Sequence, residues 1–185
     1  MRIVFATSEA NPYIKSGGLA DVLGSLPKAL VQKGHECIVV LPKYQDMKLA
    51  DTLEYVTNYD IWVGWRKCYC GVFKAEYDGV TYYFIDNEQY FRRPGLYGYD
   101  DDNERFAYFD FAVLELLSHI DIKPDILHLH DWQTAMIATL YKERYAYYEY
   151  YQGIKIVFTI HNIAYQGKCD PALLSDHFGL DTYLY

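Results

Sequence analysis

The residues best suited to chemistry lie in one short run, Lys15–Val22 (KSGGLADV), which follows the apolar segment Ile3–Thr7. Ile3–Thr7 is typical of a buried β-strand, and the apolar residues after the glycine pair are typical of a helix. Gly17 and Gly18 allow a ligand to come close to the backbone, and the first N–H groups of a helix attract anions. Lys15 adds a mobile positive charge. The order of strand, glycine loop and helix therefore predicts a site for a phosphate-bearing ligand.

This loop differs from the two commonest phosphate-binding motifs. In the P-loop the lysine follows the glycines, whereas here Lys15 precedes them, and the dinucleotide fingerprint G-x-G-x-x-G does not occur. The prediction rests on the order of the elements rather than on either motif.

Two further polar clusters contain histidine. His128 and His130 alternate along an apolar segment, so both rings would lie on one face of a strand, and with His161 they could hold zinc in a hydrolase. Alternatively, His128 is a hydrogen-bonded core residue, and Asp131 is the N-cap of the next helix while it keeps one oxygen for a ligand. His161, with Asn162 beside it, could bond a ligand hydroxyl or brace a loop. The residues alone leave these alternatives open.

An acidic run, Asp100–Asp102, has the D-x-D spacing of some metal-dependent sugar transferases. It stands just ahead of a helical pattern, where acidic side chains stabilise the helix dipole. We therefore predict a helix start there rather than a metal site.

The elements that must position these residues alternate between strands and helices. A helix is predicted over Leu19–Lys33, ended by Gly34, and an uninterrupted apolar strand over Cys37–Leu41, as in a parallel strand covered on both faces. The other predicted elements of this kind are helices at 103–123 and from 132 to about 151, and core strands at 125–130 and 154–160.

A different pattern between these elements predicts a β insertion. Short antiparallel strands are expected near Tyr55–Trp65, Cys68–Tyr77 and Val80–Ile85, with Asp78–Gly79 as a two-residue hairpin turn and Asp86–Tyr99 as a long loop. The fold class is therefore α/β, a doubly wound, mostly parallel, Rossmann-like sheet with an antiparallel insertion. Ligands bind beyond the carboxyl ends of such parallel strands, so the polar clusters should converge on one rim.

Composition narrows the classes of function. The chain has 185 residues and a formal net charge of −8, which argues against nucleic acid as a partner. No apolar run is long enough for a membrane span. Because the first residues lead straight into a strand, we expect no signal peptide. The four cysteines form no C-x-x-C pair, and we expect them to be reduced packing residues of a cytoplasmic protein. The 21 tyrosines suit stacking on sugars.

The motifs resemble one family. Lys15–Val22 is similar to the K-[TS]-G-G-L-[AG]-D-V signature of bacterial glycogen synthases and plant starch synthases. His128–Thr134 (HLHDWQT) resembles the family's H-x-H-D-W segment, Thr159–Gly167 (TIHNIAYQG) its T-[IV]-H-N-[IL]-A-Y-Q-G segment, and Tyr90–Tyr97 its tyrosine and arginine stretch. The motifs stand in the family's order and span nearly the whole chain.

The resemblance implies a retaining glucosyltransferase that moves glucose from ADP-glucose to the non-reducing end of an α-1,4-glucan, without a further cofactor or metal. It implies the GT-B architecture of two Rossmann-like domains, of which 1–185 would be an incomplete N-terminal domain that is inactive alone. The C-terminal nucleotide-binding domain, which supplies an Arg, a Lys and a Glu for transfer, would be missing from this chain.

The resemblance also implies roles for individual residues. Lys15 would face the donor diphosphate, Gly17 and Gly18 would let the backbone approach it, and Asp21 would lie nearby. On the sugar side, Asp131 and His161 would be the catalytic residues, with Asn162 beside them, and the glucan would run over Tyr97 and Tyr99. Gln133 stands where many members have histidine, so an acid–base role there is not expected.

Two alternatives of other classes remain from the residues. A non-catalytic carbohydrate-binding module would use the tyrosines alone, and a zinc hydrolase would use His128, His130 and His161. Within the enzymes, a UDP-glucose-dependent transferase is the nearest alternative, because the base would be recognised by the missing half.

Overall fold

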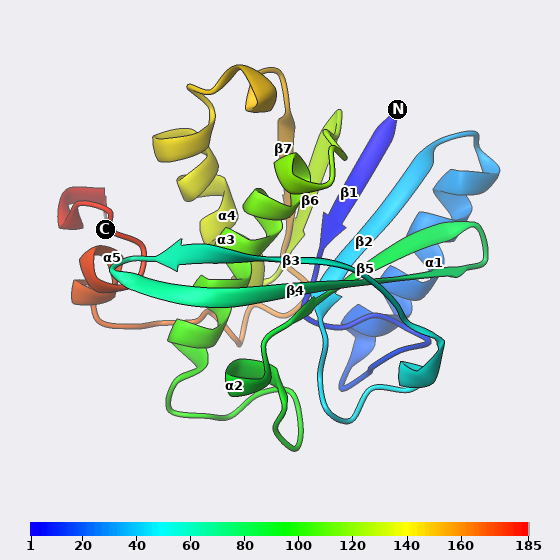
Figure 1. Ribbon diagram of the computed structural model, residues 1–185, viewed down its shortest axis with the longest axis horizontal. Helices are drawn as coiled ribbons and strands as arrows, with labels where there is room; N and C mark the ends of the chain where they lie inside the picture. The colour runs from blue at the N-terminus through cyan, green and yellow to red at the C-terminus, as the bar shows by residue number, and fades with distance from the viewer. Residues whose placement is uncertain (185) are drawn as a thin grey trace.

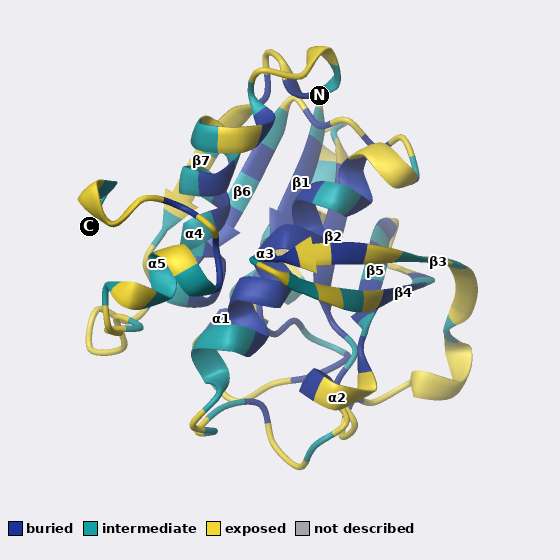
Figure 2. Cartoon of the chain, turned by 60° about the vertical axis from the view of Figure 1, so that its left-hand side comes forward, coloured by how far each residue is buried: buried dark blue, intermediate teal, exposed yellow. Residues whose placement is uncertain are grey.

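The computed structural model describes residues 1–184 and is built on one seven-stranded sheet with the order β3-β4-β5-β2-β1-β6-β7 (Figure 1). The central strands are β1 (Arg2–Ala6), β2 (Glu36–Pro42) and β6 (Ile126–His130), which pair in parallel. They are the most deeply buried part of the sheet (Figure 2). This confirms the expected doubly wound, mostly parallel α/β fold.

Helices cover both faces of this sheet. The helix α1 (Gly18–Gln32) connects β1 to β2 on one face, and α3 (Asp102–His119) and α4 (Trp132–Leu140) lie on the other (Figure 1). The β1–β2 connection leads toward one edge of the sheet, and the β6–β7 connection leads toward the other. Because both are right-handed crossovers, their helices lie on opposite faces of the sheet. Gly34 ends the α1 region with a φ of +85°, which glycine adopts without cost.

The β insertion extends the main sheet. β3 (Glu54–Val63) and β4 (Arg66–Tyr77) are antiparallel, and their bounds lie within two residues of the predicted strands at 55–65 and 68–77. β5 (Val80–Asp86) pairs antiparallel with β4 but parallel with β2, so it belongs to both parts. The Asp78–Gly79 turn is confirmed, with φ of +52° and +79° at the two residues.

The long hairpin also packs onto a helix. β3 and β4 run across α3 in Figure 1, and the Tyr59 ring stacks on the His119 ring with 3.7 Å between centroids. The predicted loop at 86–99 contains a short helix, α2 (Glu88–Phe91), in which the Asn87 side chain accepts a hydrogen bond from the Tyr90 N–H.

Two predictions near the carboxyl end are wrong. The helix expected from Trp132 to about Tyr151 ends at Leu140, followed by a π-helical turn (Tyr141–Tyr145) and a 3₁₀ turn (Glu149–Tyr151). The Tyr151 hydroxyl donates to the Leu114 carbonyl oxygen on α3, which ties the 3₁₀ turn to that helix.

β7 (Lys155–Thr159) was expected to be a core strand, but it is an exposed edge. Val157 and Phe158 are 41% and 44% exposed, and within residues 1–184 no strand pairs with the outer edge of β7. The short remaining elements are α5 (Ala172–Asp176) and 3₁₀ turns at Ala50–Thr52 and Thr182–Leu184.

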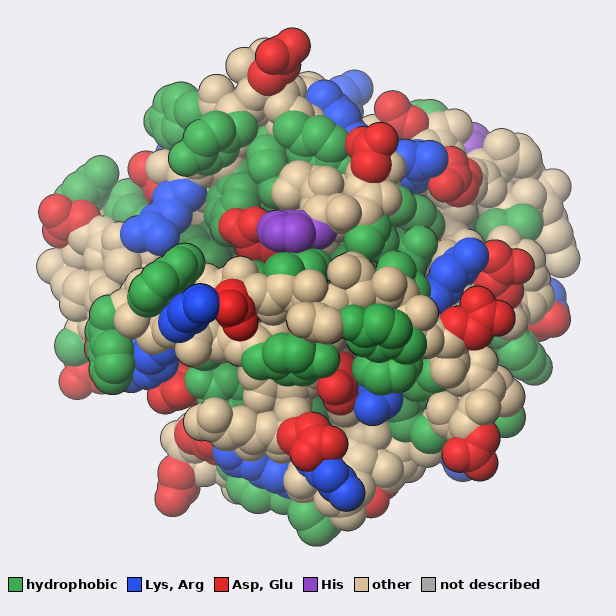
Figure 3. All heavy atoms as spheres, in the orientation of Figure 1, with side chains coloured by type: hydrophobic (Ala, Val, Ile, Leu, Met, Phe, Trp, Pro, Cys, Tyr) green, Lys and Arg blue, Asp and Glu red, His purple; other side chains and the backbone are tan. Residues whose placement is uncertain are grey.

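The surface matches the acidic composition. On the face shown in Figure 3, acidic and basic side chains are interspersed among hydrophobic ones and form no basic patch. None of the helices within residues 1–184 has the length and apolar character needed to cross a bilayer.

Candidate active site

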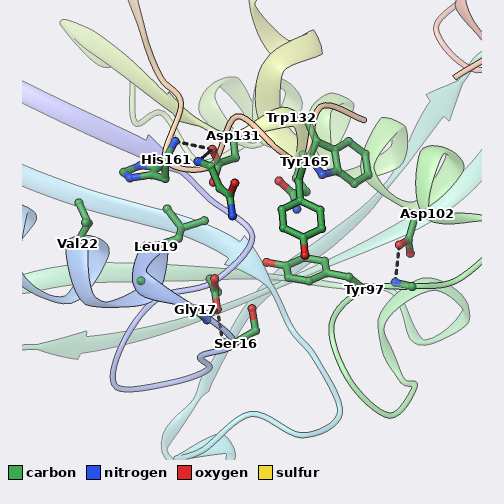
Figure 4. Close-up of a pocket in the computed structure, with 15 residues that line it drawn as sticks. Ser16, Gly17, Leu19, Val22, Tyr97, Asp102, Asp131, Trp132, His161 and Tyr165 are labelled. Atoms are coloured by element: carbon green, nitrogen blue, oxygen red, sulfur yellow. Dashed lines mark hydrogen bonds between the residues drawn. The ribbon is translucent and has the colours of Figure 1, made fainter. Parts of the chain in front are cut away.

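A pocket of about 890 Å³ opens where the carboxyl ends of β1, β6 and β7 meet, as predicted (Figure 4). It contains residues from all three predicted clusters: Gly17 and Gly18, Asp131, and His161 with Asn162. The other lining residues are Glu9, Ser16, Leu19, Val22, Tyr97, Gly98, Asp102, Trp132, Gln133 and Tyr165.

The glycine loop is held by a carboxylate that sequence reasoning missed. Glu9 is 3% exposed, and its carboxylate accepts the backbone N–H groups of Ser16 and of Gly17, the latter at 3.2 Å. These two amides are therefore not free for a phosphate. In the sequence, the only signal for Glu9 was its place in the polar run Thr7–Glu9, directly after the first strand.

The amides that begin α1 remain for a ligand. No side chain caps α1 at Gly17, and the N–H groups of Gly18 and Leu19 lie in the first turn, where a helix provides no internal partner. A Cβ built on Gly18 meets nothing within 4 Å, so the pocket side of this residue has room for a bound group. An anion here would also meet the positive end of the helix dipole.

Lys15 and Asp21 do not line the pocket. The Lys15 ammonium donates to both Asp21 carboxylate oxygens, at 2.7 and 2.6 Å, and both side chains are about half exposed. Asn11 donates to the same carboxylate at 2.7 Å. The expected position of Lys15 facing a ligand is therefore not seen, because Asp21 holds its charge beside the pocket.

Asp131 lies at the junction of β6 and α4 in a strained conformation. Its φ of +59° and ψ of −178° are adopted almost only by glycine and cost about 1–3 kcal/mol in other residues. Oδ1 accepts the N–H of His161 at 2.7 Å and that of Asn162 at 3.4 Å, which joins the ends of β6 and β7.

The predicted capping role of Asp131 is wrong. The residue occupies the N-cap position of α4, but its side chain makes no capping hydrogen bond. Thr134 closes this turn instead: its hydroxyl accepts the His130 N–H at 2.7 Å and donates to the His130 carbonyl at 2.9 Å. Both carboxylate oxygens of Asp131 are thus directed away from the helix amides.

A buried histidine supports His161. His130 is fully buried, and its Nδ1 lies 2.8 Å from Nε2 of His161. Burial, together with the neighbouring His128 and His161, lowers the pKa of His130 to about 3, so this ring is neutral at pH 7.

The neutral His130 ring determines where His161 carries its proton. Nε2 of His130 is buried without a partner, and an unpaired buried N–H group is rarer than an unpaired acceptor. We therefore assign the His130 proton to Nδ1, which donates to Nε2 of His161. His161 then carries its own proton on Nδ1, which is left to donate to a ligand.

The same contacts disfavour the zinc alternative. Nε2 of His128 bonds the Thr159 hydroxyl at 2.8 Å, which confirms the hydrogen bond of the competing interpretation, although His128 is half-buried rather than a core residue. Nδ1 of His130 and Nε2 of His161 bond each other. Within residues 1–184, no three His, Cys, Asp or Glu side chains are arranged to hold a metal ion.

The side of the pocket opposite the histidines is organised by buried Arg105. Its guanidinium donates to the Tyr90 carbonyl at 2.7 Å and to the Leu96 carbonyl at 3.2 Å, and it pairs with Asp102 at 2.5 Å. This fixes the loop that carries Tyr97, whose hydroxyl bonds the Ser8 hydroxyl at 2.7 Å.

The acidic run and Tyr99 have structural roles. Asp101 binds Arg93 through two hydrogen bonds of 2.6 and 2.8 Å, and Asp102 is the first residue of α3. The Tyr99 ring packs over the guanidinium groups of Arg93 and Arg105 and does not line the pocket. The helix-start prediction is confirmed, whereas Tyr99 as a sugar platform is not seen.

Gln133, Trp132 and Tyr165 complete the wall. Gln133 is 7% exposed and its Oε1 has no partner among the described residues, so it can accept a bond from a ligand hydroxyl. An amide cannot transfer a proton, so Gln133 cannot be a general acid or base. The pocket is lined by Glu9, Asp102 and Asp131 but, within residues 1–184, by no lysine or arginine.

Comparison with known proteins identifies this arrangement. The sequence model described as starch synthase catalytic domain matches residues 2–185. The glycogen synthases of Clostridium kluyveri and Clostridium botulinum (strain Alaska E43 / Type E3) are 51% and 52% identical over 100% of this chain, which spans 39% of each relative. Among solved structures, the catalytic domain of starch synthase IV from Arabidopsis thaliana bound to ADP and acarbose superimposes with a TM-score of 0.90. It shares 36% identity over 99% of this chain and 38% of that chain.

The family model covers nearly the whole chain, and the relatives share about half of its residues. The chain belongs to the starch synthase catalytic domain family, which includes the bacterial glycogen synthases.

Proposed function

We propose that this chain is the N-terminal, Rossmann-like part of a retaining glucosyltransferase that transfers glucose from ADP-glucose to the non-reducing end of an α-1,4-glucan. The protein would be a glycogen synthase of GT-B architecture. The family membership supports this proposal, as does the relative whose structure holds ADP and acarbose.

The observation that carries the proposal is the chemical contrast between the two sides of the pocket. Breaking the bond between sugar and diphosphate leaves negative charge on the diphosphate and positive charge on the sugar. The amides of Gly18 and Leu19, at the positive end of α1, suit the diphosphate, and the Asp131 carboxylate suits the sugar. Nδ1–H of His161 would donate to a glucose hydroxyl near the reacting carbon.

The charge of the lining explains why this part would be inactive alone. Three carboxylates and no cation among the described lining residues cannot neutralise a diphosphate. We therefore propose that a C-terminal nucleotide-binding domain elsewhere in the protein supplies the arginine and lysine that the resemblance implies. Lys15 could join them only by leaving Asp21.

The proposal also covers the cofactor requirement and the cellular compartment. The donor would be the only small molecule needed, with no further cofactor. The four cysteines are all free, which suits the reducing cytoplasm.

The test is transfer of radiolabelled glucose to glycogen by the full-length protein, with ADP-glucose and UDP-glucose compared as donors. We expect transfer from ADP-glucose, with Asp131→Asn as the matched inactive control. Calorimetry with maltooligosaccharide and with ADP-glucose separates this from a carbohydrate-binding module, which would bind only the former. If the full-length protein transfers glucose from neither ADP-glucose nor UDP-glucose, the proposal is contradicted.

A further inference from the structure

A second, smaller cavity lies behind the wall of the candidate active site. It has a volume of about 190 Å³ and is enclosed by α3, α4 and the segment at 166–178. Trp132 lines both cavities, so its indole ring separates them. The volume is several times that of a water molecule, which takes about 30 Å³ in the liquid.

This cavity is lined by a buried acid, one oxygen of which has no hydrogen-bond partner among the described residues. Asp110, on α3, lines the cavity and is 2% exposed, and its Oδ1 is buried without a hydrogen bond. Burial raises the pKa of Asp110 well above its usual range, and no neighbouring cation opposes this shift. Nothing in the proposed transfer uses this side chain.

An unpaired carboxyl of this kind is rare. Almost all buried polar side chains in native proteins have a partner, because an unpaired one costs about 1–3 kcal/mol and a charge costs more. An apolar residue at position 110 would make the folded chain more stable, unless the carboxyl binds a ligand. None of the residues within 1–184 bonds Oδ1, and the cavity that Asp110 lines has room for a partner.

The walls indicate the chemistry of that partner. The aromatic rings of Phe106, Trp132 and Phe178 line the cavity, together with the apolar side chains of Met136, Leu173 and Leu174. Aromatic faces attract organic cations, and such walls favour a cation that carries alkyl groups over a hydrated metal ion. No group of three metal-ligating side chains occurs at this place in the described chain.

We propose that this cavity binds a small alkylated ammonium ion, with Asp110 as its counter-ion and the aromatic rings around its alkyl groups. The site is distinct from the donor pocket and shares only the Trp132 wall with it. The ligand class follows from a buried carboxyl in a cavity whose walls are mainly aromatic and aliphatic, with Asn103 and Gln166 among its few polar lining residues.

The test uses the full-length protein and a pair of probes that differ in charge alone. Choline and its uncharged isostere, 3,3-dimethylbutan-1-ol, are titrated by isothermal calorimetry. We expect choline to bind at least about tenfold more tightly than the isostere, because only the cation pairs with Asp110. A crystal structure with choline should place its nitrogen next to the Asp110 carboxylate.

Three variants locate the interaction. Asp110→Asn keeps the shape of the side chain and removes its charge, and it should weaken choline binding by at least about tenfold. Asp170→Asn changes an exposed carboxylate at the same cavity and should alter binding by less than about twofold. The Ala135→Leu variant fills space in the cavity without touching a charge and should also abolish binding.

Equal binding of choline and the isostere, no binding of either, or an equal loss in Asp110→Asn and Asp170→Asn would overturn the proposal. A cavity that holds only water in the choline crystals would do the same. Because the readout is binding rather than transfer, this result is independent of the proposed glucosyltransferase activity.

Discussion

The two sides of the active-site pocket are built in different ways. On the β6–β7 side, Asp131, His130 and His161 bond one another across about thirty residues of chain, through contacts of 2.7 and 2.8 Å. On the β1 side, Glu9 occupies the loop amides and Lys15 is paired with Asp21 outside the pocket.

This difference indicates that one side of the pocket is ready for a ligand, whereas the other must exchange contacts when a ligand binds. The β6–β7 side is already assembled, since its hydrogen bonds connect residues far apart in sequence and the two shortest are partly buried. The β1 side keeps its cation in an exposed ion pair, which is worth only about 0–1 kcal/mol and is easily exchanged for a ligand contact. Substitutions on the first side should therefore be much more damaging than those on the second.

Asp131→Ala in the full-length protein gives the largest expected effect. It removes the carboxylate beside the sugar and also the acceptor of the His161 and Asn162 amides. Loss of one such preorganised group typically costs about 100- to 1000-fold in rate, and we expect the upper end of that range for turnover. Steady-state transfer from ADP-glucose to glycogen measures it.

Asp131→Asn is the control, because an amide oxygen can still accept both N–H groups. It should keep the pocket geometry in a crystal structure and yet lose most of the turnover. If Asp131→Asn transfers glucose at the wild-type rate, the charge of this residue has no role.

His161→Ala should be the next most damaging change. It removes the Nδ1–H donor, which we expect to cost about 100-fold in turnover while circular dichroism remains that of the wild type. His130→Leu keeps His161 but removes the donor to its Nε2, and should reduce turnover less, with a changed pH profile. Wild-type kinetics in His161→Ala would contradict its assigned role.

The buried histidine also predicts a pH dependence of stability on this side. The pKa of His130 is about 3 in the folded chain and about 6.5 when unfolded, so only the unfolded state binds the proton between these values. Stability is full above pH 6.5 and falls by about 1.4 kcal/mol per pH unit below it.

The melting temperature of the full-length protein, measured between pH 6.5 and 4.5, checks this slope. The decline should be shallower in His130→Asn, which does not titrate and can still donate to His161. An equal slope in both proteins would mean that His130 does not carry this proton linkage.

Sequence patterns predicted one side of the comparison better than the other. The positions of Asp131, His161 and Asn162 follow from where two apolar strands end, and this is a property of the fold. The hydrogen-bond partners of these side chains do not follow from the fold. They lie about thirty residues apart in the chain, and their pairing depends on the direction of each side chain. For this reason the capping role of Asp131 was wrong although its position was correct.

On the β1 side, the spacing of residues in the glycine loop did not predict the hydrogen-bond partners. The glycine pair correctly predicted an open approach to α1, but the nearest carboxylate, Glu9, competes for the same amides. Lys15 was expected in the pocket, whereas Asp21, six residues later, holds it outside. Local spacing shows which groups are available and does not show which of them are already paired.

Lys15→Ala tests whether this pairing is exchanged for a ligand contact. We expect turnover to fall by about tenfold, because an amide-lined site that loses its mobile cation binds the departing diphosphate less well. Asp21→Asn leaves Lys15 in place without its partner, and should change turnover by less than about threefold. Equal losses in the two variants would indicate that the ion pair acts only as structure.

The smallest expected effect is that of Glu9→Gln, which examines the β1 side without touching Lys15. The Glu9 carboxylate accepts two backbone N–H groups at the entry to α1, and charged acceptors bind about twice as strongly as neutral ones. Glutamine keeps one acceptor oxygen but loses the charge, so the free energy of unfolding should fall by about 1 kcal/mol in a urea titration. Turnover should change little, since the Gly18 and Leu19 amides are untouched. A large loss of turnover at unchanged stability would instead mean that Glu9 acts on the substrate, and the two sides of the pocket would then be equally involved in the chemistry.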